Sequence, residues 1–283
     1  GGYNTAVGRH ALTNNTTASY NVAVGNYALD LNTGEGNTAL GYNAGGIVST
    51  GYENVMVGSR AGEAVTTGHK NILIGHDAGG AITTGAKNVV IGYDAANYEG
   101  NDLTTGENCT IIGSYNRVSA SDTLQEKILG YYVMGASNSF TFGNGATDSR
   151  ISDGGTSITA PSDVRLKEEI EDEKVGLDFI NELRPVTFRW KKEKDVPVDL
   201  NAHGSGSEKR VMNGKYNHGF IAQEVKEVLD KNPNIKDGFD LWTEDVDGRQ
   251  RIGESSLISI LVKGIQELSA KNDELAAEIA SLK

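Results

Sequence analysis

The residues best suited to chemistry lie in the run Ser162-Asp-Val-Arg-Leu-Lys167, which directly follows Pro161. A serine hydroxyl becomes a useful nucleophile when a nearby base takes its proton. A lysine serves as that base only when it is neutral, which requires burial or a neighbouring cation, and Arg165 is the nearest candidate cation in sequence. Five residues of helix rotate the chain by about 140°, and a strand sends alternate residues to opposite faces. Ser162 and Lys167 therefore meet only if the chain turns within 163–166.

A simpler interpretation of the same residues involves no chemistry. Ser162 can act as the N-cap of a helix, because its hydroxyl accepts a hydrogen bond from a free backbone N–H. Lys167 and the acidic residues that follow it would then form a solvated face. On residue pattern alone this second interpretation is the simpler one.

The run 162–167 also stands at a sharp change in composition. Residues 1–161 hold 27 of the 36 glycines but only 20 of the 64 charged residues. Such a change indicates a domain boundary. Pro161 stiffens the chain at this point and favours an extended conformation of the preceding residue. We therefore expect one domain to end at residue 161 and another to begin at residue 162.

The first part of the chain is a repeat. Segments of the form Asn-x-apolar-apolar-Gly recur every 16 or 17 residues, starting at Asn4, Asn21, Asn37, Asn54, Asn71 and Asn88, and a seventh copy with one extra residue runs from Asn108 to Gly113. Each segment predicts a short strand, ended by a glycine where the backbone turns, with the asparagine hydrogen-bonding locally at the opposite corner. Stacked copies can bury an apolar face that one copy cannot. We predict a mainly β solenoid over 1–115 and a β neck over 116–161.

This repeat resembles the β-roll heads of YadA-like trimeric adhesins and the repeats of bacteriophage tail-fibre shafts. A lone solenoid of such small residues buries little apolar surface, so we expect neighbouring chains of a homotrimer to cover it. The resemblance implies a further partner, a host cell-surface glycan or protein that binds the repeat region.

The second part, 162–283, predicts α+β structure that ends in a long helix. A helical pattern covers 173–183, a strand pattern follows at 186–190, and an apolar stretch from His218 becomes helical. The end of the chain repeats every seven residues, with Ile258, Ile265, Asn272 and Ile279 at a and Leu261, Leu268, Leu275 and Leu282 at d. This predicts a coiled coil over 254–283. The a and d residues favour two strands, whereas a threefold shaft demands three, and the heptads alone leave this open.

Three motifs occur in a fixed order in this second part: Ser162-Asp-x-Arg-Leu-Lys167, Leu183-Arg-Pro-Val-Thr-Phe and Gly219-Phe-Ile-Ala-Gln-Glu-Val. Together with the closing helix they resemble the C-terminal intramolecular chaperone, a self-cleaving peptidase domain, of phage endosialidases, tail spikes and neck appendages. The resemblance implies a homotrimer that drives folding of the preceding β-fibre. It also implies that the domain then releases itself by cutting the bond between Pro161 and Ser162.

The resemblance assigns roles to individual residues. Ser162 is the nucleophile and Lys167 its base in a single-turnover serine endopeptidase without an external substrate, and His218 is the second candidate for the base. Further motif positions are Asp163, Arg165, Gly219, Gln223 and Glu224, the last two expected in the fold or an interface. We expect an N→O acyl shift to an ester, then hydrolysis. Pro161 is a departure from this pattern, because proline restricts the backbone at the bond to be cut.

Several classes of function are disfavoured. The formal net charge of −12 argues against a nucleic-acid partner. The sequence contains no run of eighteen apolar residues, the length that a membrane-spanning helix needs. Cys109 is the sole cysteine, which excludes an intrachain disulfide and a cysteine-rich metal site, and His10, His69 and His76 lack ligand spacing. We predict no metal and no cofactor.

The sequence therefore predicts a fragment of a phage tail fibre or appendage, from the C-terminal part of a longer protein because the chain opens within a repeat. The fibre would belong to the virion, and the chaperone domain would be released in the host cytoplasm. The alternative is a non-cleaving trimeric receptor-binding adhesin whose second part is a permanent clamp. A glycan-cleaving enzyme is disfavoured, because the repeats carry no carboxylate pair at fixed positions.

Overall fold

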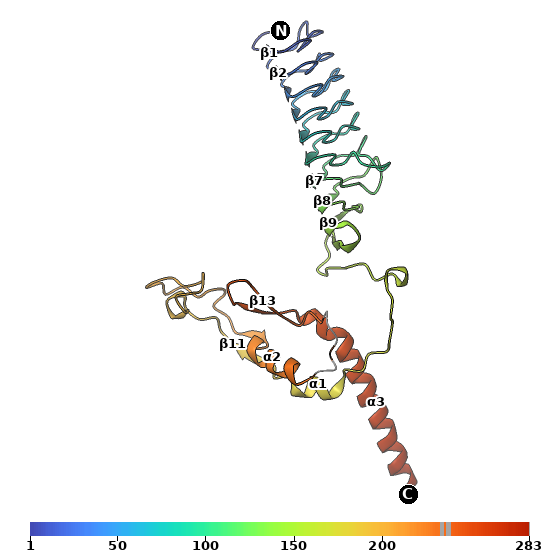
Figure 1. Ribbon diagram of the computed structural model, residues 1–283, viewed down its shortest axis with the longest axis vertical. Helices are drawn as coiled ribbons and strands as arrows, with labels where there is room; N and C mark the ends of the chain where they lie inside the picture. Colours follow the sequence, from blue (N-terminus) through green and yellow to red (C-terminus); the bar gives the residue numbers. More distant parts are fainter. Residues whose placement is uncertain (233–234, 236–238, 283) are drawn as a thin grey trace. The chain divides into compact units, whose positions relative to one another are not determined.

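The computed structural model describes residues 1–232, 235 and 239–282 of the chain. Two compact units make up the structure, Gly1–Lys167 and Glu168–Lys283. The first unit is built from repeated short strands and the second from short helices and hairpins followed by a long helix (Figure 1).

The N-terminal unit is a β-solenoid in which successive coils each contribute one short strand to a sheet of ten strands (Figure 1). Strands β1 to β9 pair in parallel in chain order, and β10 pairs antiparallel with β9. The strands are β1 (Thr5–Val7), β2 (Val22–Val24), β3 (Thr38–Leu40), β4 (Val55–Val57), β5 (Ile72–Ile74), β6 (Val89–Ile91), β7 (Thr110–Ile112), β8 (Lys127–Tyr131), β9 (Ser139–Asn144) and β10 (Ser149–Ser152). The predicted solenoid class of the first half is confirmed.

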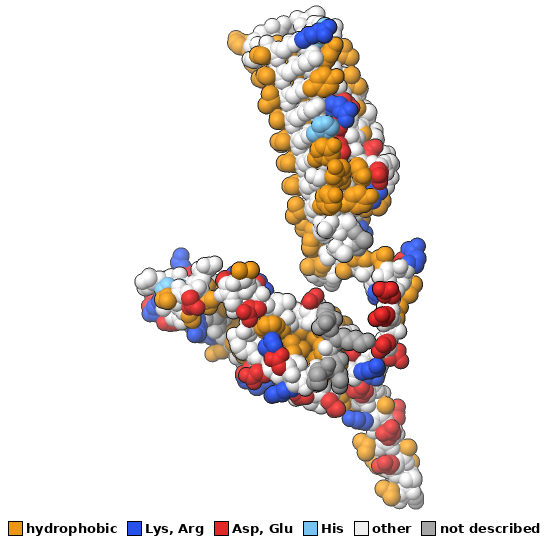
Figure 2. All heavy atoms as spheres, in the orientation of Figure 1, with side chains coloured by type: hydrophobic (Ala, Val, Ile, Leu, Met, Phe, Trp, Pro, Cys, Tyr) orange, Lys and Arg blue, Asp and Glu red, His pale blue; other side chains and the backbone are white. Residues whose placement is uncertain are grey.

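The coils stack in register around a thin apolar core. The central residues of neighbouring strands pair directly, as Met56 does with Leu73, and both side chains are fully buried. The residues on either side of each central position face outward. We call the outward apolar row the outer stripe; its members Val22, Leu40, Ile72, Ile112 and Leu129 are 38–48% exposed. Figure 2 shows hydrophobic side chains in a row along one edge of the solenoid.

The repeated asparagines form a buried ladder that joins the coils. Asn54 is fully buried; its Nδ2 donates to Gly68 O at 2.9 Å, and its backbone N donates to Asn37 Oδ1 at 3.0 Å. The same pattern holds at Asn37, Asn71 and Asn88. The prediction that these asparagines hydrogen-bond locally is therefore wrong. Their amides bond across coils, because the side chains point into the solenoid where no water can satisfy them.

The seventh coil departs from the alignment by asparagine. Val89 pairs with Thr110, so Cys109 and not Asn108 takes the ladder position, and its N donates to Asn88 Oδ1 at 2.9 Å. Burial raises the pKa of the Cys109 thiol. The longer spacing comes from residues 97–102, which we call the insertion loop. Leu103 N donates to Ala96 O at 3.0 Å and closes this loop at its base.

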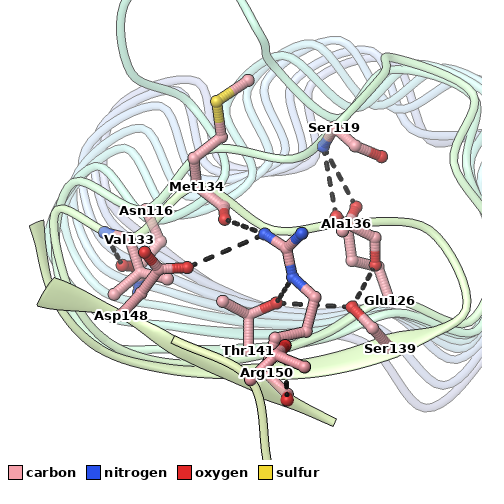
Figure 3. Close-up of polar contacts among 11 residues, drawn as sticks. Asn116, Ser119, Glu126, Val133, Met134, Ala136, Ser139, Thr141, Asp148 and Arg150 are labelled. Carbon is pink, nitrogen blue, oxygen red and sulfur yellow. Dashed lines mark hydrogen bonds and ion pairs between the residues drawn. The ribbon is translucent and has the colours of Figure 1, made fainter. Parts of the chain in front are cut away.

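The parallel sheet continues beyond the last repeat, through β8 and β9 of the predicted neck. Glu126 occupies the next ladder position with its side chain fully buried, and both of its carboxylate oxygens accept from Ser119 N at 3.2 Å. Burial raises the pKa of Glu126. Nearby, Arg150 of β10 donates from Nε to Thr141 Oγ1 at 3.1 Å (Figure 3). The last coils thus replace the amide ladder by a carboxyl group and a short polar network.

The glycine that ends each strand is required by two independent constraints. Gly58 has φ +134°, a conformation that side-chain-bearing residues rarely adopt. A Cβ at Gly58 would also lie 2.3 Å from the carbonyl oxygen of Gly75 in the next coil. The glycine therefore permits both the turn and the close stacking of coils.

The described part of the C-terminal unit forms two hairpins and three helices. Its elements are α1 (Leu177–Glu182), β11 (Val186–Phe188), β12 (Asn217–Gly219), α2 (Ala222–Lys231), β13 (Trp242–Glu244), β14 (Gln250–Ile252) and α3 (Leu257–Ser281). Strand β11 pairs antiparallel with β12, and β13 with β14. Among the described residues of both units there are four 3₁₀ turns: η1 (Gly145–Thr147) and η2 (Val164–Leu166) in the first unit, and η3 (Glu193–Asp195) and η4 (Glu254–Ser256) in the second. A small core holds Phe179, Val225, Val228, Leu241, Leu257 and Ile260. The predicted α+β class is confirmed.

Helix α3 confirms the predicted long terminal helix; Lys283, the last residue of the predicted segment, lies outside the described residues. Its first half buries Leu257, Ile260 and Gly264 within its own unit. The heptad side chains lie on another face and are exposed, with Ile265 at 66% and Leu268 at 48%. The helix therefore has one apolar face in use and a second one unoccupied in the single chain. No described helix has the length and apolar character needed to cross a membrane.

Candidate functional site

The motif Ser162–Lys167 contains the turn that its chemistry requires. Residues Val164–Leu166 form η2, and Asp163 caps this turn, since its Oδ1 accepts from Arg165 N at 2.9 Å. The turn brings together two side chains that a continuous strand or helix would hold apart. Lys167 Nζ donates to Ser162 Oγ at 2.8 Å. Ser162 therefore caps no helix in the structure; the neighbouring Asp163 has the capping role.

Arg165 contacts Asp163 and not Lys167. Its Nε donates to both carboxylate oxygens of Asp163 at 3.0 Å. This pairing lowers the pKa of Asp163 and raises that of Arg165, mainly through their side-chain hydrogen bonds. Arg165, the predicted cationic neighbour of Lys167, is thus engaged in fixing the turn. Its charge is balanced by Asp163.

The segment around the motif is open to solvent. Residues 161–170 are all exposed, including Pro161, Ser162 and Lys167. A lysine that accepts a proton from serine needs an environment that disfavours the ammonium form, such as a buried site. The single chain places the two reactive side chains in contact without enclosing them.

His218, the second candidate base, lies in the C-terminal unit. It is the central residue of β12, pairs with Thr187 of β11 and is exposed. It lines an open pocket of about 460 Å³ together with Pro185, Val186, Thr187, Gly219, Phe220 and Glu254. Gly219 approaches Glu254 closely, since a Cβ there would lie 3.2 Å from Glu254 Oε1. The motif glycine thus leaves room for an acidic side chain beside the histidine.

The third motif is tied to the second by an ion pair. Glu224 at the start of α2 accepts from Arg184 Nε at 2.9 Å, and a further contact to Arg184 Nη2 makes the pair bidentate. The hydrogen bond to Arg184 lowers the pKa of Glu224. Gln223 is exposed. The contact of Glu224 agrees with its expected place in the fold.

Sequence reasoning did not assign a role to Glu267 of the closing helix. Its Oε2 accepts from Leu177 N at 2.9 Å, so the α3 side chain caps the first turn of α1. This bond lowers the pKa of Glu267. Helix α1 starts at Leu177, later than the predicted residue 173. Gly176 directly precedes the helix, and the bond to Glu267 satisfies the backbone N–H of its first residue. Its place in the terminal heptad helix carries no information about a partner 90 residues away.

One group of potential metal ligands occurs in the described solenoid. Atoms of His76, Asp77 and Asp94 lie within 4.8 Å of one another. Asp77 is already bonded through both oxygens to Arg60, at 2.7 Å for the Nε contact. A cation bound there would have to displace the guanidinium. The arrangement is an ion-pair network between coils, and its donor set fits a metal poorly.

Comparison with known proteins gives one match. A family model of peptidases, Peptidase_S74, described as chaperone of endosialidase, matches residues 162–232. No curated protein matches the chain, and no solved structure matches it. The matched segment starts at Ser162 and includes the contact with Lys167, the hairpin that carries His218 and the Arg184–Glu224 pair. Residues 162–232 are therefore similar to the chaperone of endosialidase family, and a β-solenoid precedes them.

Proposed function

We propose that this chain is part of a phage tail-fibre-like protein whose C-terminal domain trimerises, assists folding of the solenoid and then cuts the Pro161–Ser162 bond. The observation that supports this most is the hydrogen bond from Lys167 Nζ to Ser162 Oγ at 2.8 Å, at the first residue of the family match. A heavy-atom distance of this size lets a neutral lysine take the serine proton. The peptidase family of the matched segment supports the same reaction.

The reaction follows from the position of Ser162 on the amine side of the bond. Lys167 in its neutral form takes the Oγ proton, and Oγ attacks the carbonyl carbon of Pro161. The C–N bond breaks, and the Ser162 nitrogen receives the proton from the Lys167 ammonium. The result is an ester between Pro161 and Ser162 Oγ. Water then hydrolyses the ester with Lys167 again as base, which leaves a carboxylate on Pro161 and a free serine hydroxyl and amine.

Assembly supplies what the single chain lacks. The heptad face of α3 is exposed at Ile258, Ile265 and Ile279, by 58–66%. Isoleucine and leucine side chains that repeat at a and d associate with the same positions of other helices. A trimer formed through this face and through the outer stripe would bring neighbouring chains around residues 161–170. Burial of Ser162 and Lys167 by these chains would then favour the neutral form of Lys167. Cleavage would therefore follow assembly.

The experiment that tests this proposal compares chains by denaturing gel and intact mass after purification. The wild type should give two fragments, the second beginning with Ser162. Ser162→Ala should remain one chain with unchanged oligomeric state by light scattering. A wild type that remains intact after prolonged incubation contradicts the proposal.

The exposure of Ser162 and Lys167 favours a second candidate function, a permanent clamp. In this reading the heptad face joins the chains, and the 2.8 Å contact only stabilises a surface turn. Exposed contacts of this kind contribute little to stability. A stable, uncut wild-type trimer would support the clamp.

A further inference from the structure

We propose that five tyrosines on the last coils of the solenoid form a binding surface for a neutral saccharide. The residues are Tyr93, Tyr98, Tyr115, Tyr131 and Tyr132, which we call the tyrosine platform. This proposal does not depend on the cleavage at Pro161–Ser162. It concerns a different surface and a different chemistry.

The rings of the platform pack on one another around Tyr115. The Tyr115 ring centroid lies 4.8 Å from that of Tyr98, 5.3 Å from that of Tyr93 and 5.8 Å from that of Tyr131. Tyr98 also contacts Tyr132, at 5.6 Å. Most of these pairs are edge-to-face, an arrangement that aromatic rings favour and that holds them in place. Five rings from three successive coils therefore form one pre-organised surface.

Two of the five tyrosines are exposed, Tyr131 by 55% and Tyr93 by 45%. Tyr98, Tyr115 and Tyr132 are half-buried. Figure 2 shows hydrophobic side chains gathered on the visible face of the solenoid with acidic side chains at their edge. An exposed, contiguous apolar patch with a polar rim is typical of an interaction site.

The platform exists because the repeat is interrupted there. Between the buried core residues Ala78 and Ile82 of the fifth coil lie three residues, but between the equivalent Ala95 and Leu103 lie seven. The added residues form the insertion loop, which carries Tyr98 into contact with Tyr115 and Tyr132. Insertions in solenoids map to loops on one face, often the binding face. A loop that served only to connect coils would not need to depart from the period.

Elsewhere in the solenoid several ring pairs stack in parallel from coil to coil. Tyr3 with Tyr20 and His10 with Tyr27 have interplanar angles of 5° and 8°, whereas Tyr27 with Tyr42 is edge-to-face at 89°. The three rings that contact Tyr115 are all tilted against it, by 59–88°. The platform therefore differs from the single ring pairs in gathering several rings around one.

Polar groups lie beside the rings. Tyr132 Oη donates to Glu99 Oε2 at 3.5 Å, and a hydrogen bond with Glu99 raises the pKa of the Tyr98 hydroxyl. The Arg117 guanidinium lies over the Tyr132 ring, 5.1 Å from its centroid. A carboxylate and a guanidinium therefore adjoin the platform.

This combination of groups matches the surface of a sugar ring. The C–H face of a pyranose stacks on an aromatic face, and its hydroxyls donate to carboxylates and accept from a guanidinium. The carboxylates of Asp94, Glu99 and Asp102 disfavour an acidic sugar through like-charge repulsion. The net charge of −12 has the same effect. A neutral hexose or N-acetylhexosamine chain is therefore the class of ligand that fits.

The test measures binding of the full chain to an array that carries neutral hexose and N-acetylhexosamine glycans beside sialylated ones. We expect binding to neutral glycans, and a loss of at least tenfold in affinity for Tyr98→Ala. Replacing the insertion loop by Gly-Ala, the pair at the equivalent position of the fifth coil, should cause the same loss of affinity. This replacement removes Tyr98 and restores the length of the regular coils. Tyr20→Ala is the matched control, an exposed tyrosine with one ring partner, and should bind like the wild type.

Three results would overturn the inference: no neutral glycan bound by the wild type, binding to sialylated glycans alone, or wild-type affinity in both Tyr98→Ala and the variant without the insertion loop. Thermal unfolding verifies that each variant is folded. Light scattering gives the remaining decisive outcome, because a change of oligomeric state in Tyr98→Ala would identify the platform as a subunit contact. None of these results bears on the gel pattern, so failure here leaves the cleavage proposal intact.

Discussion

Lys167 Nζ lies 2.8 Å from Ser162 Oγ, across a 3₁₀ turn whose cap is Asp163. The turn is held by side chains of the motif itself, so the contact is encoded within six residues. Asp163 and Arg165 are thus positioning residues for the pair. This local encoding is suited to a reaction that each chain carries out once, on its own backbone.

The first prediction concerns the turn. Asp163→Ala removes the cap and the partner of Arg165, so the contact of Ser162 with Lys167 loses its support. We expect cleavage to slow by at least tenfold, measured as the appearance of the Ser162 fragment over time. Asp163→Asn keeps an acceptor for Arg165 N and should retain more activity than alanine. Equal rates for wild type and Asp163→Ala would show that the cap has no part in the reaction.

The second prediction concerns the intermediate. An N→O acyl shift passes through an ester at Ser162, which hydroxylamine attacks far more readily than an amide. Wild-type protein that assembles in the presence of hydroxylamine should therefore yield an N-terminal fragment ending in a hydroxamate at Pro161. Mass spectrometry of the C-terminal peptide of that fragment detects it. Only a free carboxylate, at every hydroxylamine concentration, would argue for direct attack by water.

The third prediction tests the asparagine ladder. Asn54→Ala leaves Gly68 O and the backbone N of Asn71 without partners inside the solenoid. Unsatisfied buried groups of this kind make a loss of about 2–4 kcal/mol in unfolding free energy. Urea unfolding of the variant measures this loss. Asn14→Ala is the control, because its exposed amide makes one hydrogen bond, to Asp30 O, and should change stability little. Equal effects at both sites would contradict the ladder.

The fourth prediction uses the buried carboxyl group at the end of the solenoid. The pKa of Glu126 is raised by burial, so the folded state holds a proton that the unfolded state releases above about pH 4.3. Its contribution to stability is complete below that value and is lost as pH rises through the folded-state pKa. Glu126→Gln removes this loss. The variant should therefore gain stability relative to the wild type as pH rises from about 5 to about 8, in denaturant unfolding at each pH. Parallel stability curves would mean that Glu126 is not protonated in the fold.

The fifth prediction concerns assembly. Ile265→Lys together with Leu268→Lys places charges at the exposed a and d positions of α3. We expect dissociation to monomers in light scattering, because charged side chains at a and d would disrupt the helix–helix seam that the heptads predict. Ala270→Lys adds a charge on the same helix outside a and d and should leave the oligomer intact. Variants that both remain oligomeric would place the contact elsewhere.

The solenoid was predictable because each coil repeats one local pattern. Strand, glycine turn and period follow from short-range preferences, and repetition makes the pattern visible. The role of the asparagines was not predictable from one unit, because their partners lie in the adjacent coils. Cys109 shows the same limit, since the insertion loop shifts the ladder position by one residue and only the strand register reveals it.

The candidate site was predictable in its residues but not in its geometry. The sequence required a turn within 163–166, and the structure contains one, but the pairing of Arg165 with Asp163 had no sequence signal. Glu267 and the tyrosine platform depend on contacts between distant or successive coils and helices. Such contacts arise from packing, which a motif in one stretch of chain does not record.

The most direct test of the central claim follows the intact mass of purified wild type, Lys167→Arg and Ser162→Ala over the same time course. Lys167→Arg keeps a donor to Ser162 but cannot take its proton, because arginine stays charged. The account predicts that the wild type converts to a fragment that starts at Ser162 and that both variants remain whole. Cleavage of Lys167→Arg at the wild-type rate, or cleavage of Ser162→Ala at the same bond, would contradict it.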